Sequence, residues 1–273
     1  MPESESTEVA AQSPVGDGGR RRFLKLIAVG GGLAAFGALR GKLPIEYLTG
    51  IPSDVTQPAP GANRAWVMVI DLNRCDGCGS CTAACSNEHL VPAGQEWIKI
   101  YEVEAEGGGK YFMPRPCMHC ESAPCVNVCP VNATYTRSDG LVLINHDRCI
   151  GCRYCMAACP YNARYFNWDG SPELTPEQRA QYRPEHPVVH RRGTVEKCVF
   201  CAHRVDEGRL PACVEACPMK AIYFGDARED AVSNGSEVAS LSKLIRQGGA
   251  FRWKEELGTK PRVFYLPPRR DSP

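Results

Sequence analysis

A short run near the middle of the chain decides how it can fold, and it reads Cys149-Ile150-Gly151-Cys152-Arg153-Tyr154-Cys155-Met156-Ala157-Ala158-Cys159-Pro160. Its four cysteines have the spacing Cys-x2-Cys-x2-Cys-x3-Cys, and a proline follows the last one. Spacing this short and regular is typical of metal ligands. We therefore expect this part of the chain to fold around bound metal.

Three more motifs of the same kind account for every other cysteine. The chain has 16 cysteines in 273 residues, and none is left over. In chain order, the four motifs are Cys75, Cys78, Cys81 and Cys85; Cys117, Cys120, Cys125 and Cys129; Cys149, Cys152, Cys155 and Cys159; and Cys198, Cys201, Cys213 and Cys217. Motif 1 repeats the spacing of motif 3, with Ser86 in place of the proline. Motifs 2 and 4 are looser, and both end in x3-Cys-Pro.

Disulfides, zinc and iron–sulfur clusters are the three ways to use so many cysteines. Disulfides suit exported proteins, but two cysteines separated by only two residues make an awkward bridge, and Cys-x-x-Cys recurs throughout this chain. Zinc stays an alternative for motif 4, because Cys198 and Cys201 could open a zinc ribbon. The x3-Cys-Pro ending instead matches the bacterial ferredoxin run, in which three cysteines wrap one cluster and the fourth binds a second cluster. Thiolate sulfur is also a soft ligand that suits iron.

The sequence repeats itself, and the repeats indicate the fold. Residues 70–78 align with residues 144–152, and residues 125–130 align with residues 213–218. Each repeat predicts a strand, a cysteine loop, a short helix and a second strand. A mean hydropathy of −0.30 and 22 prolines indicate many loops. We therefore predict a loop-rich α+β fold.

Several elements are expected at definite places. The strands Trp66–Leu72 and Leu141–Ile144 enter cysteine loops, Ser80–Glu88 forms a helix that carries Cys85, and residues 98–113 form a hairpin. One face of a later helix is expected to carry Val238, Leu241, Leu244 and Ile245, with Gly248 just past its end.

The N-terminal residues resemble a twin-arginine signal. Residues 20–25 read Arg-Arg-Arg-Phe-Leu-Lys, and an apolar run from Leu26 to Leu39 follows them. This run is shorter than the roughly 20 residues that span a bilayer. We expect residues 1–43 to be a signal peptide or a retained anchor, and residues 44–64 to be a Pro-rich linker; a basic patch beside a buried helix is the alternative.

Charge and motifs exclude several classes of function. The formal net charge is +1, which gives no attraction to nucleic acid. The sequence has no glycine-rich nucleotide-binding turn after a strand, no Gly-x-Ser-x-Gly and no His-Glu-x-x-His. We therefore expect no catalytic residue.

The four motifs in this order, over residues 65–226, resemble the four-cluster iron–sulfur subunits of the DMSO, polysulfide and tetrathionate reductase complexes and of the formate-dependent nitrite reductase system. Residues 260–266 also resemble the closing segment of several members. The resemblance implies four [4Fe–4S] clusters, with motif 1 paired with motif 4 and motif 2 with motif 3. The implied ligand sets are Cys75, Cys78, Cys81 and Cys217 for cluster one; Cys198, Cys201, Cys213 and Cys85 for cluster two; Cys117, Cys120, Cys125 and Cys159 for cluster three; and Cys149, Cys152, Cys155 and Cys129 for cluster four.

This pairing implies two dicluster ferredoxin-like halves, one inserted in the other. The halves would be residues 65–109 plus 190–228, and residues 110–167, with an insertion at residues 168–197 and a helix and tail at residues 229–273. The insertion is either a solvated loop or a docking surface for a partner. His119 either tunes a cluster through a hydrogen bond or is a solvated loop histidine, and the six histidines show no ligand spacing.

The resemblance implies an electron-transfer subunit. It would relay electrons between a polytopic quinone-interacting membrane subunit and a catalytic subunit, either a molybdopterin enzyme or a multihaem cytochrome, with sulfur compounds among the substrates. The chain would be peripheral to the outer face of the cytoplasmic membrane or periplasmic. A hydrogenase or cytochrome-type nitrite reductase complex, a self-sufficient reductase, and a scaffold stapled by metal are the alternatives.

Overall fold

The computed structural model describes residues 63–105, 108–169, 175–180 and 182–268. The expected leader at residues 1–43 and nearly all of the expected linker at residues 44–64 lie outside these ranges. Within the described ranges, no helix has both the length and the apolar character needed to cross a membrane.

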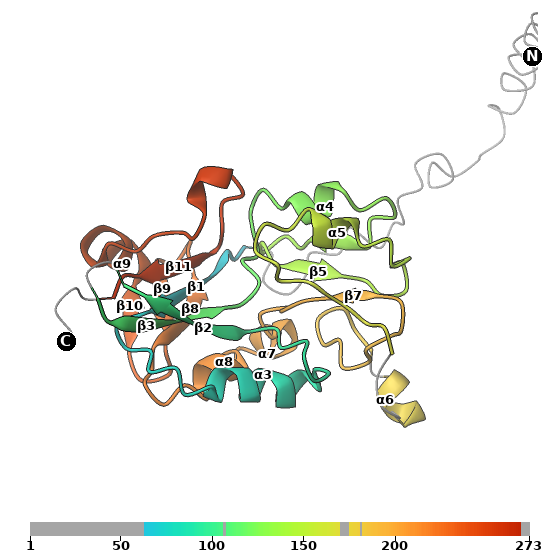
Figure 1. Cartoon of the computed structure of the whole chain (residues 1–273), viewed down its shortest axis with the longest axis horizontal. Coiled ribbons are helices and arrows are strands. Elements are labelled where there is room, and N and C mark those ends of the chain that lie inside the picture. Colours follow the sequence, from blue (N-terminus) through green and yellow to red (C-terminus); the bar gives the residue numbers. More distant parts are fainter. Residues whose placement is uncertain (1–62, 106–107, 170–174, 181, 269–273) are drawn as a thin grey trace, which may run out of the picture. The chain divides into compact units, whose positions relative to one another are not determined.

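A five-stranded sheet with the order β10-β9-β8-β1-β11 forms the first half (Figure 1). Its strands are β1 (Trp66–Asp71), β8 (Ile222–Asp226), β9 (Ala231–Ser233), β10 (Val238–Ser240) and β11 (Val263–Leu266). Strand β1 lies between β8 and β11 and confirms the strand expected there; it runs antiparallel to β8 and parallel to β11. The closing segment of the chain is therefore a strand of this sheet and not only a tail.

Both faces of the sheet are covered, because side chains alternate along β1. Val67 and Val69 point to one face and pack with Leu241 of helix α9 (Leu241–Gly248). Met68 and Ile70 point to the other face and join the main core, which contains most of the buried cysteines. The sheet thus separates a small apolar cluster on one face from the cysteine-rich core on the other.

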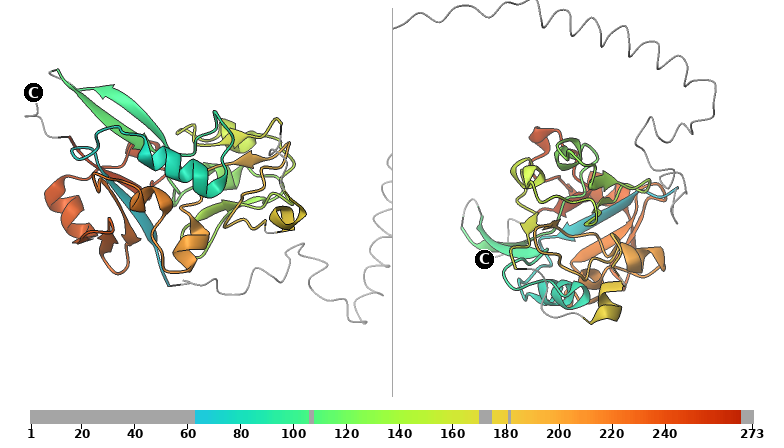
Figure 2. Two further views of the ribbon diagram at one scale, coloured as in Figure 1. Left: turned by 90° about the horizontal axis from the view of Figure 1, so that it is seen from below. Right: turned by 90° about the vertical axis from the view of Figure 1, so that its right-hand side faces the viewer.

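Short helices and a hairpin complete the first half. The helices are α3 (Ser80–His89), α7 (Ala202–Asp206) and α8 (Ala212–Glu215), with a 3₁₀ helix η2 (Glu255–Leu257), and the hairpin consists of β2 (Lys99–Glu104) and β3 (Lys110–Arg115). Helix α3 and the antiparallel hairpin confirm the sequence predictions. Figure 2 shows the hairpin extending away from the rest of the fold.

The second half is smaller and has no large sheet among its described residues. Its elements are α4 (Pro124–Asn127), β4 (Thr134–Thr136), β5 (Val142–Ile144), α5 (Tyr154–Ala157), β6 (Tyr165–Phe166), α6 (Pro176–Ala180) and β7 (Val195–Glu196). Strand β4 pairs with β5, and β6 pairs with β7. Strand β7 therefore belongs with this half, although the expected boundary gave its residues to the insertion and to the first half.

The prediction for the C-terminal helix was wrong at both ends. Val238 lies on β10 and is 74% exposed, so it is not on the helix face. The helix starts later because the Ser240 hydroxyl accepts a hydrogen bond from the Lys243 amide and caps it. At the other end, Gly248 is the last helical residue and Gly249, with φ 67°, is the cap.

A buried ion pair joins the two halves. Arg137, between β4 and β5, donates to Asp139 at 2.6 Å and to Asp206 of α7 at 2.8 Å. The Trp66 indole of β1 also donates to Asp139, at 3.0 Å. Burial tends to lower the pKa of Arg137, but its hydrogen bonds to the two carboxylates outweigh burial and raise it. The guanidinium is therefore a fixed charge that binds elements of both halves.

We expect Arg137→Met to destabilise the folded, cofactor-loaded protein by about 3–5 kcal/mol, because the Asp139 carboxylate would lose its buried partner. Anaerobic urea unfolding followed by circular dichroism measures this. Lys110→Met is the matched control, since it removes a bridge to Glu102 between exposed side chains and should cost at most about 1 kcal/mol. Equal urea midpoints for the two variants would show that the Arg137 pair does not hold the halves together.

Candidate metal centres

The structure gathers the thiols in four sets, each of which combines cysteines from two motifs. Three sets line separate small hollows of similar size. We name the sets set one (Cys75, Cys78, Cys81 and Cys217), set three (Cys117, Cys120, Cys125 and Cys159) and set four (Cys129, Cys149, Cys152 and Cys155). Each hollow thus receives three cysteines from one motif and one from another.

The remaining four cysteines, Cys85, Cys198, Cys201 and Cys213, form set two. All four are buried. Burial raises the pKa of Cys213 well above its usual value, and the nearby thiols of Cys201, Cys85 and Cys198 raise it further. Helix α3, which carries Cys85, packs against α8, which carries Cys213, so motifs 1 and 4 meet in this set.

Strand pairing explains how distant cysteines meet. In the antiparallel pair β1 and β8, Ile70 faces Ile222; continuing this register past the strand ends brings the loop of Cys75 opposite that of Cys217. The pair β4 and β5 repeats the arrangement, because Thr134 faces Ile144 and the loops of Cys129 and Cys149 follow from those strand ends. The same sheet register therefore places the first cysteine of one motif beside the last cysteine of the other.

Glycine makes the tight cysteine loops of motifs 1 and 3 fit. Gly151, between Cys149 and Cys152, has a φ of 69°, and a Cβ atom there would lie 2.1 Å from the Gly193 carbonyl oxygen. Gly77 is equivalent, with a φ of 78°, and a Cβ atom there would lie 2.6 Å from the Phe112 ring. Only glycine adopts this backbone without strain, so the loops keep their shape by contact with neighbouring segments.

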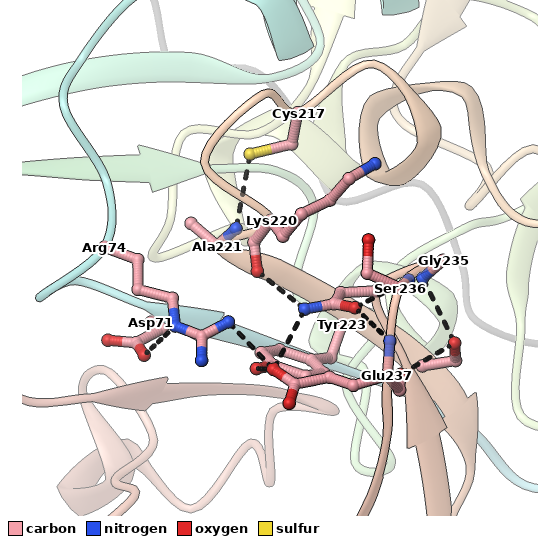
Figure 3. A network of polar contacts seen from close by, with 11 residues as sticks. Asp71, Arg74, Cys217, Lys220, Ala221, Tyr223, Gly235, Ser236 and Glu237 are labelled. Atoms are coloured by element: carbon pink, nitrogen blue, oxygen red, sulfur yellow. Dashed lines mark hydrogen bonds and ion pairs between the residues drawn. The ribbon is translucent and has the colours of Figure 1, made fainter.

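Hydrogen bonds also hold the sulfur atoms and the loops that carry them. The Ala221 amide donates to Cys217 Sγ at 3.3 Å, and Figure 3 shows the polar network that fixes this loop. In this network, Glu237 accepts from Arg74 at 2.8 Å and from the Tyr223 hydroxyl at 2.6 Å. Donors aimed at sulfur stabilise the thiolate form, and the network keeps them in place.

Buried thiols in these sets are poorly ionised by themselves. Burial raises the pKa of Cys81, Cys120 and Cys201 to about 12 and that of Cys198 to about 11. Metal binding requires thiolates, so it must release these protons. The buried thiols of these sets therefore become thiolates only when a bound metal supplies positive charge.

The donor sets fit [4Fe–4S] clusters better than zinc or disulfides. All sixteen cysteines lie in the described part of the chain, and all are free. Sets one, three and four each take three cysteines from one motif and the fourth from another, which is the ligand pattern of the bacterial ferredoxin run and not that of a zinc ribbon. Soft sulfur ligands also suit iron.

Sequence reasoning missed a cluster of histidines beside set two. His89 Nε2 lies 3.2 Å from Cys201 Sγ, and His190 Nε2 lies 3.0 Å from the His89 carbonyl oxygen. The rings of His186 and His203 stack at 3.7 Å with 20° between their planes. One metal ion cannot lie in the plane of two stacked rings, so these histidines do not form a good additional metal site. No local spacing could reveal them, because they come from distant segments.

His119 is not a solvated histidine, because it is fully buried. The Val142 amide donates to its Nδ1 at 3.0 Å, so Nε2 carries the hydrogen and donates to the Cys198 carbonyl oxygen at 3.0 Å. Burial, and then the Lys197 ammonium, hold the pKa of His119 well below its usual value. A neutral ring from motif 2 therefore contacts the backbone of motif 4.

The expected insertion at residues 168–197 is not a solvated loop over its whole length. Its later residues Val188, His190, Thr194, Glu196 and Lys197 are buried. Among them, His190 contacts the His89 carbonyl oxygen at the end of α3, and Lys197 donates to the Val142 carbonyl oxygen of β5, so this part of the segment contacts both halves. Arg191 and Arg192 stay exposed within this part, so only the buried residues are excluded from a docking surface.

Comparison with known proteins agrees with this geometry. Two family models, each described as a 4Fe-4S dicluster domain, match residues 74–133 and residues 109–173 with 185–227. The chain is 46% identical over 215 residues to a Halobacterium salinarum protein provisionally named as a dimethyl sulfoxide reductase iron–sulfur subunit, covering 73% of this chain and 78% of the relative.

Two further relatives are similar over most of their length. A selenate reductase subunit of Mesobacillus selenatarsenatis is 42% identical, over 74% of this chain and 71% of the relative. A tetrathionate reductase subunit of Salmonella typhimurium is 36% identical, over 92% of this chain and 88% of the relative. Together with the cysteine geometry, these matches show that the chain belongs to the ferredoxin-type family of 4Fe-4S electron-transfer subunits that includes the iron–sulfur subunits of dimethyl sulfoxide and tetrathionate reductases.

Proposed function

We propose that this chain binds four [4Fe–4S] clusters and relays electrons between a quinone-interacting membrane subunit and a catalytic subunit of an exported respiratory complex. Sets one to four would hold clusters one to four, with the ligands that the family resemblance implies. The observation that carries the proposal is the convergence of three cysteines from one motif and one from another on hollows of similar size. A bound [4Fe–4S] cluster supplies a one-electron carrier with a potential between about −700 and +450 mV.

The chain links neighbouring sets through short helices. Cys81 of set one and Cys85 of set two are four residues apart on α3, which is about one helical turn. Cys155 of set four lies on α5, and Cys159 of set three follows this helix. These covalent links keep the members of each pair of sets adjacent.

A second kind of link joins sets two and three. His119, between two cysteines of set three, donates to the carbonyl of Cys198 in set two. The sets therefore follow one another in the order one, two, three, four, as a relay requires.

Exposure favours the two ends of this series as the points of electron entry and exit. Cys78 of set one and Cys152 of set four are exposed, whereas all four cysteines of set two are buried. We propose that the catalytic and membrane partners approach these exposed ends, and that the twin-arginine signal carries the chain to the outer side of the membrane. The relatives are themselves named as subunits of reductases, which supports a partner-dependent role.

Four clusters predict about sixteen iron and sixteen acid-labile sulfide atoms per chain. Anaerobic metal and sulfide analysis of the native complex, with EPR-monitored redox titration, measures this. Several interacting S = 1/2 signals should develop on reduction. Stoichiometric zinc, or about eight iron atoms per chain, would contradict the proposal, and clusters that cannot be reduced would favour a scaffold.

The ligand assignment predicts different outcomes for two neighbouring cysteines on the same motif. Cys213→Ser should alter only the EPR signature of cluster two, and Cys217→Ser only that of cluster one. Cys75→Ser should alter the same signature as Cys217→Ser. The double variant Cys75→Ser with Cys217→Ser should therefore affect one cluster, and Cys213→Ser with Cys217→Ser should affect two.

The main alternative is that each motif binds its own cluster. In that case, Cys213→Ser and Cys217→Ser would alter the same signature, and Cys75→Ser would alter another. Iron analysis of each variant provides the control, because the unaffected clusters must remain bound.

A further inference from the structure

Two buried cations lie at the junctions between consecutive thiol sets. Lys197 is 1% exposed and Arg164 is 5% exposed. Such residues are almost never buried to this degree unless they are paired. Neither has an ion pair with a carboxylate among the described residues. Their positive charges are therefore not neutralised by an acidic side chain of the described residues.

Lys197 lies between sets two and three. Its ammonium group donates to the Cys198 carbonyl oxygen at 2.8 Å and also to the Val142 carbonyl oxygen. Cys198 belongs to set two, and Val142 lines the hollow of set three. Burial lowers the pKa of Lys197, and the negative charge of the sulfur atoms of Cys117, Cys198 and Cys125 acts against this lowering. The ammonium form is therefore held by its two carbonyl acceptors and by the thiolates of sets two and three. In Figure 1, β5, which carries Val142, and β7, which ends just before Lys197, are neighbours.

Arg164 lies between sets three and four. Its side chain lines the hollow of set three. Its Nη1 atom is 3.3 Å from the Thr134 hydroxyl, and Thr134 lines the hollow of set four. The guanidinium also interacts electrostatically with Cys125 of set three and Cys155 of set four.

We propose that Lys197 and Arg164 are positioning residues that raise the reduction potentials of the clusters on either side of them. This inference rests on the four-cluster function proposed above. Reduction adds one electron to a cluster, and a nearby positive charge stabilises the added negative charge. Lys197 thus favours reduction of clusters two and three, and Arg164 favours reduction of clusters three and four. Cluster three receives both effects, so its potential should respond to the removal of either cation.

Neutral variants of each cation test this in the native complex. Lys197→Met should lower the reduction equilibrium constants of clusters two and three at least tenfold, a shift of about 59 mV for a one-electron couple. Arg164→Met should lower those of clusters three and four by a similar factor. Cluster one should keep its potential in both variants. EPR-monitored redox titration measures the four potentials, with the signals assigned from the cysteine variants.

Conservative variants separate charge from packing. Lys197→Arg and Arg164→Lys keep the charge and should restore the potentials, whereas Lys197→Gln and Arg164→Gln keep a hydrogen-bond donor and should not. Lys110→Met removes an exposed cation and should leave all four potentials unchanged. A purely structural role would instead be rescued by the glutamine variants.

The outcome distinguishes this inference from the proposed function. Wild-type iron content with unchanged potentials in Lys197→Met and Arg164→Met would overturn the role of the cations and leave the four-cluster relay intact. Absence of four clusters in the wild type would overturn both. If the methionine variants do not assemble, Lys197→Gln and Arg164→Gln decide, because they keep a hydrogen-bond donor without the charge, and unchanged potentials in both would contradict the inference.

Discussion

Sulfur buried in a protein interior needs positive charge beside it before it can be a thiolate, and the rest of this chain follows from that requirement. Burial raises the pKa of Cys81 and Cys201 to about 12, so neither thiol would ionise near neutral pH by itself. Bound metal reverses this balance, because a coordinating thiol is deprotonated outright. Ligand bonds then supply folding free energy that a loop-rich chain cannot gain from apolar burial alone. Cofactor binding and folding are thus expected to be one process.

Antiparallel pairing provides the geometry for this process. The register of β1 with β8 leads the loops of motifs 1 and 4 to the same end of the sheet, and the register of β4 with β5 does so for motifs 2 and 3. Strand pairing in these two sheets therefore helps to form sets one and four, although no strand residue is itself a ligand. Strand β11 pairs with β1 on the side opposite to β8. Residues 263–266 are therefore hydrogen-bonded to the strand that leads into motif 1.

The features that the sequence could predict are those encoded by short-range spacing. The cysteine motifs, the helix that carries Cys85 and the hairpin at residues 98–113 depend on residues close together in the chain. His89 contacts Cys201, which is far away in the sequence. Lys197 is buried by segments that are also distant in the chain. No local sequence pattern encodes either feature. Val238 shows the limit of periodicity, since its spacing fits a helix face but the Ser240 cap starts the helix after it.

Four chemically identical donor sets cannot by themselves produce four different potentials. The hollows of sets one, three and four also have similar sizes, so any differences must arise from the protein around each set. The surroundings do differ: set one has the exposed Cys78, set two adjoins histidines, and set three lies against Arg164. The two ferredoxin-like halves repeat the ligand pattern but not its polar environment. The insertion of one half into the other creates the junction between sets two and three, where Lys197 contacts both, whereas Arg164 lies between two sets of the same half.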